Sequence, residues 1–296
     1  MAVAFACGGC GLGPGPGTHN VTLTVTRGFG SRTIASITRR NVPGSETVMR
    51  MLERSLRIST RYGGGFVESL DGFGPSASSI DWFYYVNGVQ APIGAASTSV
   101  HPGDRIWWDL HDWRVAESIP AVVGSFPEPF VDGIGGKRYP VTVQCGPGVG
   151  AACKRVTSVL DAAHVPAAPQ VLGAGSGSDT LTVVVGTWAQ LRPEVVAQLI
   201  AQGPSASGVY ARFRAGGASL QLLGPAGEVV RTLGADAGLV AATAEQSSVP
   251  TWVVTGTDNA GVAAAARAFN ASALHDHFAL AVDGSAQLPI PLDPLR

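Results

Sequence analysis

Aromatic residues concentrate between Trp82 and Trp113, although they make up only 7% of this 296-residue chain. The run Trp82-Phe83-Tyr84-Tyr85 consists of residues that favour β-strands, and an Asn-Gly pair, typical of a hairpin turn, follows closely. Side chains alternate between the two faces of a strand, so Trp82 and Tyr84 share one face while Phe83 and Tyr85 share the other. A strand with large rings on both faces must bury at least one of them.

A second aromatic pair, Trp107-Trp108, lies in another predicted strand, and its two rings must also point to opposite faces. One set of rings can fill a core while the other lines an exposed apolar patch, which usually marks a binding site. The alternative is that all of these rings pack internally. We expect a ligand surface, with His111 as a polar anchor or simply part of a surface turn. The candidate ligand-binding residues are Trp82, Tyr84, Tyr85, Asn87, Trp108 and His111.

The elements around these strands predict a small α+β unit over residues 19–114. Alternating β-branched residues at 21–26 predict a half-buried strand, with 32–38 as its hairpin partner. Apolar residues at helical spacing follow, and Ser45 or Gly44 can serve as the N-cap of that helix. The remaining strands are expected after the glycines at 63–65, at 80–86 and at 105–110. One helix would then lie across a mixed sheet.

Proline and glycine recur from 115 to 137, which predicts a linker or covering loop. From 138 to 296, strands alternate with helices, a pattern that favours an α/β sandwich. Strands are expected at 139–145, 180–186, 208–213, 219–223, 228–231, 251–256 and 277–282, and helices at 150–164, 189–202 and 260–269.

Composition narrows the function classes. The formal net charge is −1 and no basic run is longer than a pair of residues, whereas nucleic-acid binding normally needs a concentrated positive stripe. No apolar run approaches the roughly 20 residues of a membrane-spanning helix. We therefore expect no nucleic-acid partner, and contact with a membrane only through a lipid anchor.

Residues 1–18 have the character of a leader or tether. The first six are apolar, and Cys7-Gly8-Gly9-Cys10 then opens a stretch rich in glycine and proline. This looks like the end of a bacterial lipoprotein signal, in which a cysteine after small residues is lipidated. Cys10 is the preferred site because Gly9 precedes it, and Cys7 is the alternative. The apolar part is shorter than a signal requires, so a plain leader with two incidental thiols stays open.

The other two cysteines predict a disulfide. Cys145 and Cys153 bracket a short loop rich in glycine, which can bring them within bonding range. Free thiols are the alternative. The pair Cys7 and Cys10 has no matching second pair of cysteines or histidines at zinc spacing, so we expect no zinc site.

Motifs of the first unit follow one another in a recognisable order. They are Val48-Met49-Arg50-Met51-Leu52, Tyr62-Gly63-Gly64-Gly65-Phe66-Val67, Asp81-Trp82-Phe83-Tyr84-Tyr85-Val86-Asn87-Gly88, Gly94-Ala95-Ala96 and Pro102-Gly103-Asp104-Arg105-Ile106-Trp107-Trp108-Asp109. This order resembles the transcobalamin-like C-terminal domain, catalogued in bacteria as a domain of unknown function, number 4430. The resemblance covers about residues 19–113 and implies a β-grasp-like fold.

The same resemblance implies a candidate ligand. In the vertebrate vitamin B12 carriers, a domain of this family contacts one face of cobalamin, and a helical barrel holds the other. Nothing in this sequence predicts such a barrel, so cobalamin rests on the resemblance alone. We expect no other cofactor.

The sequence contains only weak matches to known catalytic motifs. No Gly-x-Ser-x-Gly elbow occurs, and the glycine-rich 173–177 lacks the lysine of a phosphate loop, so it predicts a flexible turn. His275-Asp276-His277 could offer two imidazoles to a metal, but a polar approach to the last strand explains it without a third ligand. The turn at 255–259 could hold an anion at a helix N-terminus, or could simply be capped by Thr257 or Asp258. We expect neither a metal site nor enzymatic activity.

These observations favour an extracytoplasmic protein, tethered to the cell surface or secreted, whose first unit binds a planar or hydrophobic small molecule. A corrinoid such as cobalamin is the candidate. The alternative is an adhesion or scaffold protein whose exposed surface meets another surface or transport protein. No motif predicts the role of the second unit.

Overall fold

The sheet of the N-terminal unit forms where β-branched and aromatic residues predict strands. In the computed structural model, which describes residues 20–293 except 176 and 246–248, β1 (Val21–Arg27) pairs in parallel with β7 (Arg105–Asp112). β7 pairs antiparallel with β5 (Ile80–Val86). The whole order is β2-β1-β7-β5-β6, with β2 at Arg32–Arg39 and β6 at Val89–Gln90. In chain order the five strands lie second, first, fifth, third and fourth, as in a β-grasp fold, so the predicted mixed sheet is confirmed.

The helix α1 (Val48–Ser55) packs its apolar side on this sheet, as predicted. Its N-cap differs from the prediction, because the side chain of Thr47, and not that of Ser45 or the backbone at Gly44, accepts the first-turn amide hydrogen bond. The helix therefore begins later than expected. Glu46 precedes the helix and is buried.

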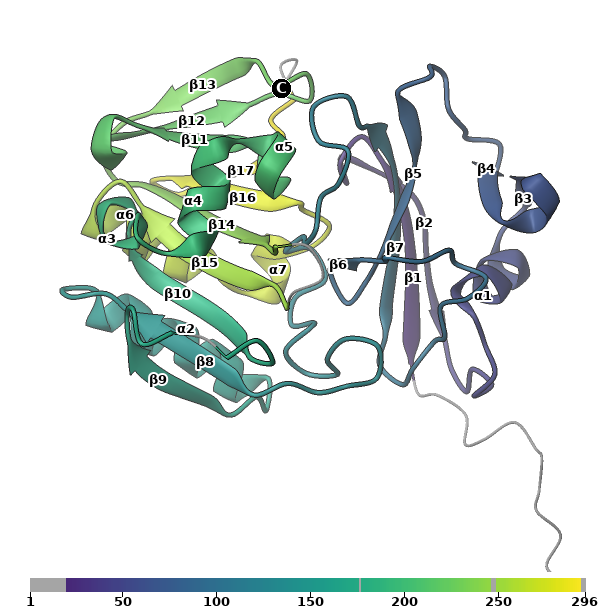
Figure 1. Ribbon diagram of the computed structural model, residues 1–296, viewed down its shortest axis with the longest axis horizontal. Coiled ribbons are helices and arrows are strands. Elements are labelled where there is room, and N and C mark those ends of the chain that lie inside the picture. Colours follow the sequence, from purple (N-terminus) through teal and green to yellow (C-terminus); the bar gives the residue numbers. More distant parts are fainter. Residues whose placement is uncertain (1–19, 176, 246–248, 294–296) are drawn as a thin grey trace, which may run out of the picture.

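A separate hairpin lies next to α1. It consists of β3 (Ile58–Arg61), a 3-10 turn η1 (Tyr62–Gly64) and β4 (Phe66–Leu70), which form their own two-stranded sheet. Val67 and Leu70 anchor the hairpin in the same core as α1. Figure 1 shows the hairpin on the side of the N-terminal unit that faces away from the second unit.

The connection between the units contains no helix or regular strand from 113 to 140. It is not a loose linker, however. Val122, Phe126 and Phe130 are buried, with no more than 5% of each residue exposed. The segment predicted as a Pro/Gly-rich linker at 115–137 thus packs against both units, because its apolar residues fill the space between them.

The second unit is built on a seven-stranded sheet in the order β17-β16-β14-β15-β10-β8-β9. Strands β9, β8, β10 and β15 run parallel to one another, and β14, β16 and β17 continue the sheet with antiparallel pairing. The bounds are β8 Val141–Cys145, β9 Ala167–Val171, β10 Leu181–Thr187, β14 Ala237–Thr243, β15 Thr251–Gly256, β16 Ala279–Asp283 and β17 Ala286–Ile290.

Helices and a small sheet cover the two faces of this large sheet (Figure 1). One face packs against α2 (Gly150–Ala162) and α6 (Asn259–Ala268). The other face packs against two helices and a three-stranded sheet: α3 (Trp188–Leu191), α4 (Val195–Gln202), β11 (Ala211–Arg214), β12 (Ser219–Leu223) and β13 (Val229–Leu233). The short elements α5 (Pro204–Ser207), η2 (Ala215–Gly217) and α7 (Ala271–Leu274) complete the unit. The predicted α/β sandwich is confirmed, although the helix expected at 189–202 is divided into α3 and α4.

Candidate functional site

The predicted aromatic residues of one sheet face belong to the core beneath α1. Trp82 is 7% exposed and Trp108 only 3%. Tyr84 is half-buried, stacks on Trp108 with 4.7 Å between the ring centres, and shares a 2.8 Å hydrogen bond between its hydroxyl and that of Thr98. The alternation expected along β5 is therefore present, and this face is a hydrophobic core.

The opposite face of the sheet is covered by the second unit. Tyr85 and Trp107 contact Phe278, with ring centres 5.6 and 5.1 Å apart. His111 lies between the rings of Phe29 and Phe83, at 4.6 and 4.5 Å. The expectation of an exposed aromatic face here is wrong, because the second unit buries the rings that would have formed it.

His111 belongs to a buried polar cluster centred on Asp109. The carboxylate of Asp109 accepts hydrogen bonds from the backbone amides of Phe29 and Gly30, at 2.9 and 2.8 Å, and from the hydroxyl of Thr26. Nδ1 of His111 lies 2.8 Å from the same carboxylate. A buried charge is tolerated when it is paired and fully hydrogen-bonded. The cluster therefore holds the β1–β2 turn against β7.

Asn87 is also a structural residue in this structure. It is fully buried, and its side-chain amide donates to Asp104 at 2.9 Å and to the carbonyl of Gly133 at 2.8 Å. Its side-chain oxygen accepts the amide of Arg105 at 2.8 Å. Asn87 thus joins the β5–β6 turn to the connection between the units, and it has no free polar group to offer a ligand.

A surface pocket of about 680 Å³ lies elsewhere in the same unit, between the β3–β4 hairpin and the start of β5. We call it the hairpin pocket. This volume falls within the range of about 300–1,000 Å³ that is typical of small-molecule sites. Its wall includes Ser59 and Arg61 of β3, Phe66 and Glu68 of β4, and Asp81 of β5.

Charged and hydroxyl groups line the hairpin pocket. Nε of Arg61 donates to Glu68 at 2.7 Å, and this hydrogen bond is the main cause that lowers the pKa of the Glu68 carboxyl. Ser59 shares a 2.7 Å hydrogen bond with Ser69 across the hairpin. Burial raises the pKa of Asp81, although its carboxylate accepts the amide of the next residue. The pocket therefore offers one cation and two acids to the polar edge of a ligand.

One exposed ring lies in the wall of the hairpin pocket, and a second lies next to it, with 6.4 Å between the ring centres. Tyr62 is 87% exposed and its only close ring contact among the described residues is Phe66, itself 42% exposed and part of the pocket wall. Tyr62 also has a φ of 53°, in the left-handed region that residues other than glycine avoid, and Gly63 and Gly64 follow with φ of 70° and 92°. Such strain costs about 1–3 kcal/mol and is found at functional sites.

The sequence contained a signal for these two rings. The run Tyr62-Gly63-Gly64-Gly65-Phe66 places one aromatic residue on each side of three glycines. Glycines in series predict a tight left-handed turn, so this run marks the end of a hairpin with a ring on each side. The denser run of rings, in contrast, lies in the buried strands β5 and β7.

A second large pocket, of about 790 Å³, lies between the two units. Val89 of β6, Tyr139 and Leu199 of α4 contribute to its wall. It is also lined by Ala244 and Val249, and residues 246–248 between them lie outside the described part of the chain. We therefore assign no site there.

The other candidate motifs lie in the second unit. Asp258 is the N-cap of α6, accepting the amide of Gly261 at 2.9 Å, so its own carboxylate occupies the position considered for an anion. His277 is largely buried, and burial lowers its pKa, whereas His275 is exposed. The 173–177 segment joins β9 to β10, and residue 176 lies outside the described part. No cluster of three metal-binding side chains occurs within the described residues.

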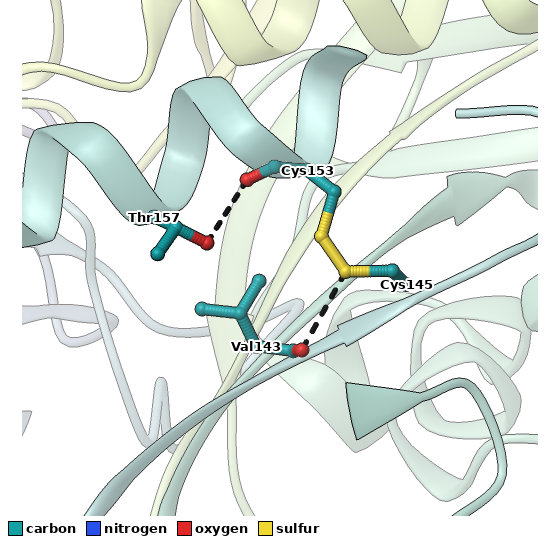
Figure 2. The surroundings of a disulfide bond; sticks show 4 residues. All are labelled: Val143, Cys145, Cys153 and Thr157. Carbon is teal, nitrogen blue, oxygen red and sulfur yellow. Dashed lines mark hydrogen bonds between the residues drawn. A yellow bond between two sulfur atoms is a disulfide. The ribbon is translucent and has the colours of Figure 1, made fainter. Parts of the chain in front are cut away.

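The predicted disulfide is confirmed. Cys145, the last residue of β8, is bonded to Cys153 in the first turns of α2 (Figure 2). Sγ of Cys145 lies 3.6 Å from the carbonyl oxygen of Val143, and the hydroxyl of Thr157 donates to the carbonyl of Cys153 at 3.1 Å. The bond therefore fixes the start of α2 to the end of its preceding strand. Cys7 and Cys10 lie outside the described residues, and none of the described helices is long and apolar enough to span a membrane.

The sheet order and the single covering helix define the N-terminal unit as a β-grasp-like domain. Within it, residues 45–112 match the family described as Domain of unknown function (DUF4430), which agrees with the motifs of the sequence. The match includes α1, the hairpin pocket and the central strands β5 and β7. No curated protein matches the chain.

Solved structures also match part of the chain. One is a crystal structure of a proposed metal binding protein from Ruminococcus gnavus ATCC 29149. It is 18% identical, with a TM-score of 0.26, and the match covers 32% of this chain and 97% of that chain.

Proposed function

We propose that this protein binds a small molecule in the hairpin pocket, with a planar or hydrophobic face of the ligand against Tyr62 and Phe66. The observation that carries the proposal is a pocket of ligand size with the exposed ring of Phe66 in its wall, beside the strained and exposed Tyr62. A planar ligand would stack on one of the two rings, which are inclined at 76° to each other, and its polar edge would meet Arg61 and Asp81. A corrinoid such as cobalamin has this combination of a large face and polar side groups.

The test is a titration of the purified chain with cyanocobalamin and hydroxocobalamin, followed by calorimetry and by the corrin absorption spectrum. Hemin and riboflavin serve as further planar probes. Tyr62→Ala and Phe66→Ala should each weaken binding by about tenfold, since a stacked ring contributes on the order of 1 kcal/mol or more. The matched control is Val229→Ala, which truncates another exposed apolar side chain, in β13 of the second unit.

Two results would overturn this proposal. If none of the four probes binds saturably at millimolar concentration, the protein does not bind a planar small molecule of this kind. If Val229→Ala and Tyr62→Ala lose affinity equally, the ligand does not bind in the hairpin pocket. Binding of hemin or riboflavin without cobalamin would reject only the corrinoid.

The alternative is an adhesion or scaffold protein, and β9 favours it. This strand forms one edge of the large sheet, most of its residues are exposed, and Val171 is 75% exposed. An uncovered edge strand can pair with a strand of another protein. If the alternative holds, cells that display the protein will adhere to a second surface, and Val171→Lys will reduce that adhesion without changing the cobalamin titration.

We also propose a surface location through an N-terminal lipid. Mass spectrometry of the native protein should then find a diacylated cysteine at position 10 as the first residue. An intact Met1, or an unmodified cysteine at both 7 and 10, contradicts the anchor and leaves the ligand proposal unaffected.

A further inference from the structure

A small pocket of about 200 Å³ lies between the end of β2 and α1, on a different part of the N-terminal unit from the hairpin pocket. We call it the arginine pocket, because Arg39, Arg40 and Arg54 line it together with Glu46. Its volume is below the range of about 300–1,000 Å³ typical of drug-sized ligands. Any ligand that it holds is therefore small.

Hydrogen bonds hold two of the three guanidinium groups in place. Arg39 donates from Nε to the hydroxyl of Ser55 at 3.3 Å and from Nη2 to the carbonyl of Arg54 at 3.2 Å. Arg54 donates from Nη1 to Glu46 Oε2 at 2.9 Å. The side chain of Arg40 is exposed and has no partner among the described residues, so its donors are available to a ligand.

Glu46 supplies an unmet acceptor in the wall of the arginine pocket. Only 2% of the residue is exposed, and Oε1 has no hydrogen-bond partner among the described residues. Its backbone is fixed on both sides, because its amide donates to Pro43 at 2.9 Å and its carbonyl accepts the amide of Val100 at 3.1 Å. A buried acceptor without a donor is costly, on the order of 1–3 kcal/mol. Oε1 is closed to solvent, so a donor brought by a ligand would reach it after a shift of the side chains around it, and would then remove that cost.

Three guanidinium groups and one carboxylate in so small a space define the ligand chemistry. Arginine binds phosphate through paired hydrogen bonds, and the excess of positive charge requires an anion with several acceptor oxygens. The free oxygen of Glu46 requires a donor on the same molecule. We propose that the arginine pocket binds a phosphate monoester or diester that carries an amine, the chemistry of phosphoethanolamine, with the phosphate at Arg40 and Arg39 and the ammonium at Glu46.

This chemistry occurs both in free metabolites and in lipid headgroups. Arg39 pairs with Val21 at the start of β1, so the arginine pocket lies beside the first described residues of the chain. A lipid source would suit a protein whose preceding segment is anchored in a membrane. The experiment therefore separates the two sources.

The first arm titrates the full chain with phosphoethanolamine, inorganic phosphate and ethanolamine, followed by calorimetry and phosphorus NMR. The second arm measures sedimentation with vesicles of phosphatidylcholine, with and without phosphatidylethanolamine. We expect phosphoethanolamine to bind about tenfold more tightly than phosphate alone, because only it supplies a donor to Glu46. Binding in the first arm identifies a free ligand as sufficient, and binding only to the vesicles that contain phosphatidylethanolamine identifies the lipid.

Variants test the two halves of the site. Arg40→Gln should weaken binding by about tenfold or more, since it removes a charge–phosphate contact and no contact within the protein. Glu46→Gln should abolish the preference for phosphoethanolamine over phosphate. Arg32→Gln is the matched control, an exposed arginine of β2 outside the pocket. Tyr62→Ala should leave this binding unchanged, which separates it from the proposed function of the hairpin pocket.

No saturable binding in either arm overturns the proposal. So does an equal effect of Arg40→Gln and Arg32→Gln, which would indicate a general charge effect of the surface. If Glu46→Gln fails to fold, equal affinity of the unaltered chain for phosphate and phosphoethanolamine still refutes the role of Glu46.

Discussion

Glu128 lies where the connection between the units meets the N-terminal sheet, and only 3% of the residue is exposed. Its carboxyl accepts the backbone amide of Asp132 at 2.8 Å. Burial raises the pKa of Glu128 to about 7, and the nearby carboxylates of Asp132 and Asp104 act in the same direction. At neutral pH this group is therefore poised between its two protonation states.

The raised pKa predicts a pH-dependent stability. The folded chain binds the proton of Glu128 more tightly than the unfolded chain, so the free energy of unfolding falls as pH rises from about 4.5 to about 7. Glu128→Gln should raise that free energy by about 3 kcal/mol at about pH 8 and have little effect at about pH 4. Urea denaturation over this pH range measures it.

The control for this prediction is Glu117→Gln, which alters an exposed glutamate of the same connection. The control should change the stability by no more than about 0.5 kcal/mol at any pH. A gain for Glu128→Gln that is the same at low and high pH would contradict the assignment to its ionisation.

Single residues also mark the limit of prediction from sequence. The alternation of Trp82 to Tyr85 was predictable, because the two faces of a strand follow from local geometry. That Tyr85 and His111 are buried was not, because the residue that covers them, Phe278, is distant in the chain. The missed N-cap has a local cause, since Thr47 offers the same hydroxyl chemistry as Ser45 two positions later.

At the scale of elements, close packing of α6 on β14 depends on glycines. A Cβ atom on Gly261 of α6 would lie 2.1 Å from the carbonyl oxygen of Ala237 in β14, and one on Gly238 would lie 2.5 Å from the carbonyl of Gly261. β14 consists mostly of small residues, and it is not among the strands expected from the sequence. Small residues carry little β-propensity, so only the packing partner explains them.

Gly261→Ala should therefore destabilise the second unit by about 1–3 kcal/mol, because the added methyl group forces α6 away from the sheet. Gly150→Ala is the matched control: it also lies at the start of a helix, α2, but a Cβ there meets nothing within 4 Å. The control should be neutral or slightly stabilising. Thermal denaturation that ranks the two variants in the opposite order would show that α6 is not held so closely.

The disulfide belongs to the same scale, since it joins β8 to α2. Replacing Cys145 and Cys153 together by serine should lower the free energy of unfolding by about 2–3 kcal/mol, the loss expected for a short closed loop. Denaturation of the oxidised protein, the reduced protein and the double variant measures it. Alkylation without reduction should leave both cysteines unmodified, and their modification would mean that the bond does not form.

For the whole molecule, the contact between the units is an aromatic core. Phe278 of the second unit contacts Phe29, Tyr85, Trp107 and His111 of the first, with ring centres 5.1–5.6 Å apart. Contacts of this kind are buried and complementary in shape, unlike those of loosely joined domains. We expect the two units to unfold in a single transition.

Phe278→Ala should remove this coupling. The truncation should cost about 3–5 kcal/mol and should expose Trp107, which is 2% exposed in the intact protein. Calorimetry should then resolve two transitions, and acrylamide should quench tryptophan fluorescence more strongly. Phe213→Ala is the control. Phe213 stacks on Trp188 inside the second unit, so its replacement should destabilise that unit alone. Two transitions in the unaltered chain would contradict the coupling.

Because the sheet face between the units is buried, the exposed candidate surfaces lie elsewhere on the molecule. The β3–β4 hairpin lies on the far side of the N-terminal unit, and the edge strand β9 lies on the far side of the second unit, as Figure 1 shows. A cargo at the hairpin and a neighbour at β9 could be engaged together, since neither would obstruct the other. Because a buried aromatic contact joins the two units, both units would lie between two such partners.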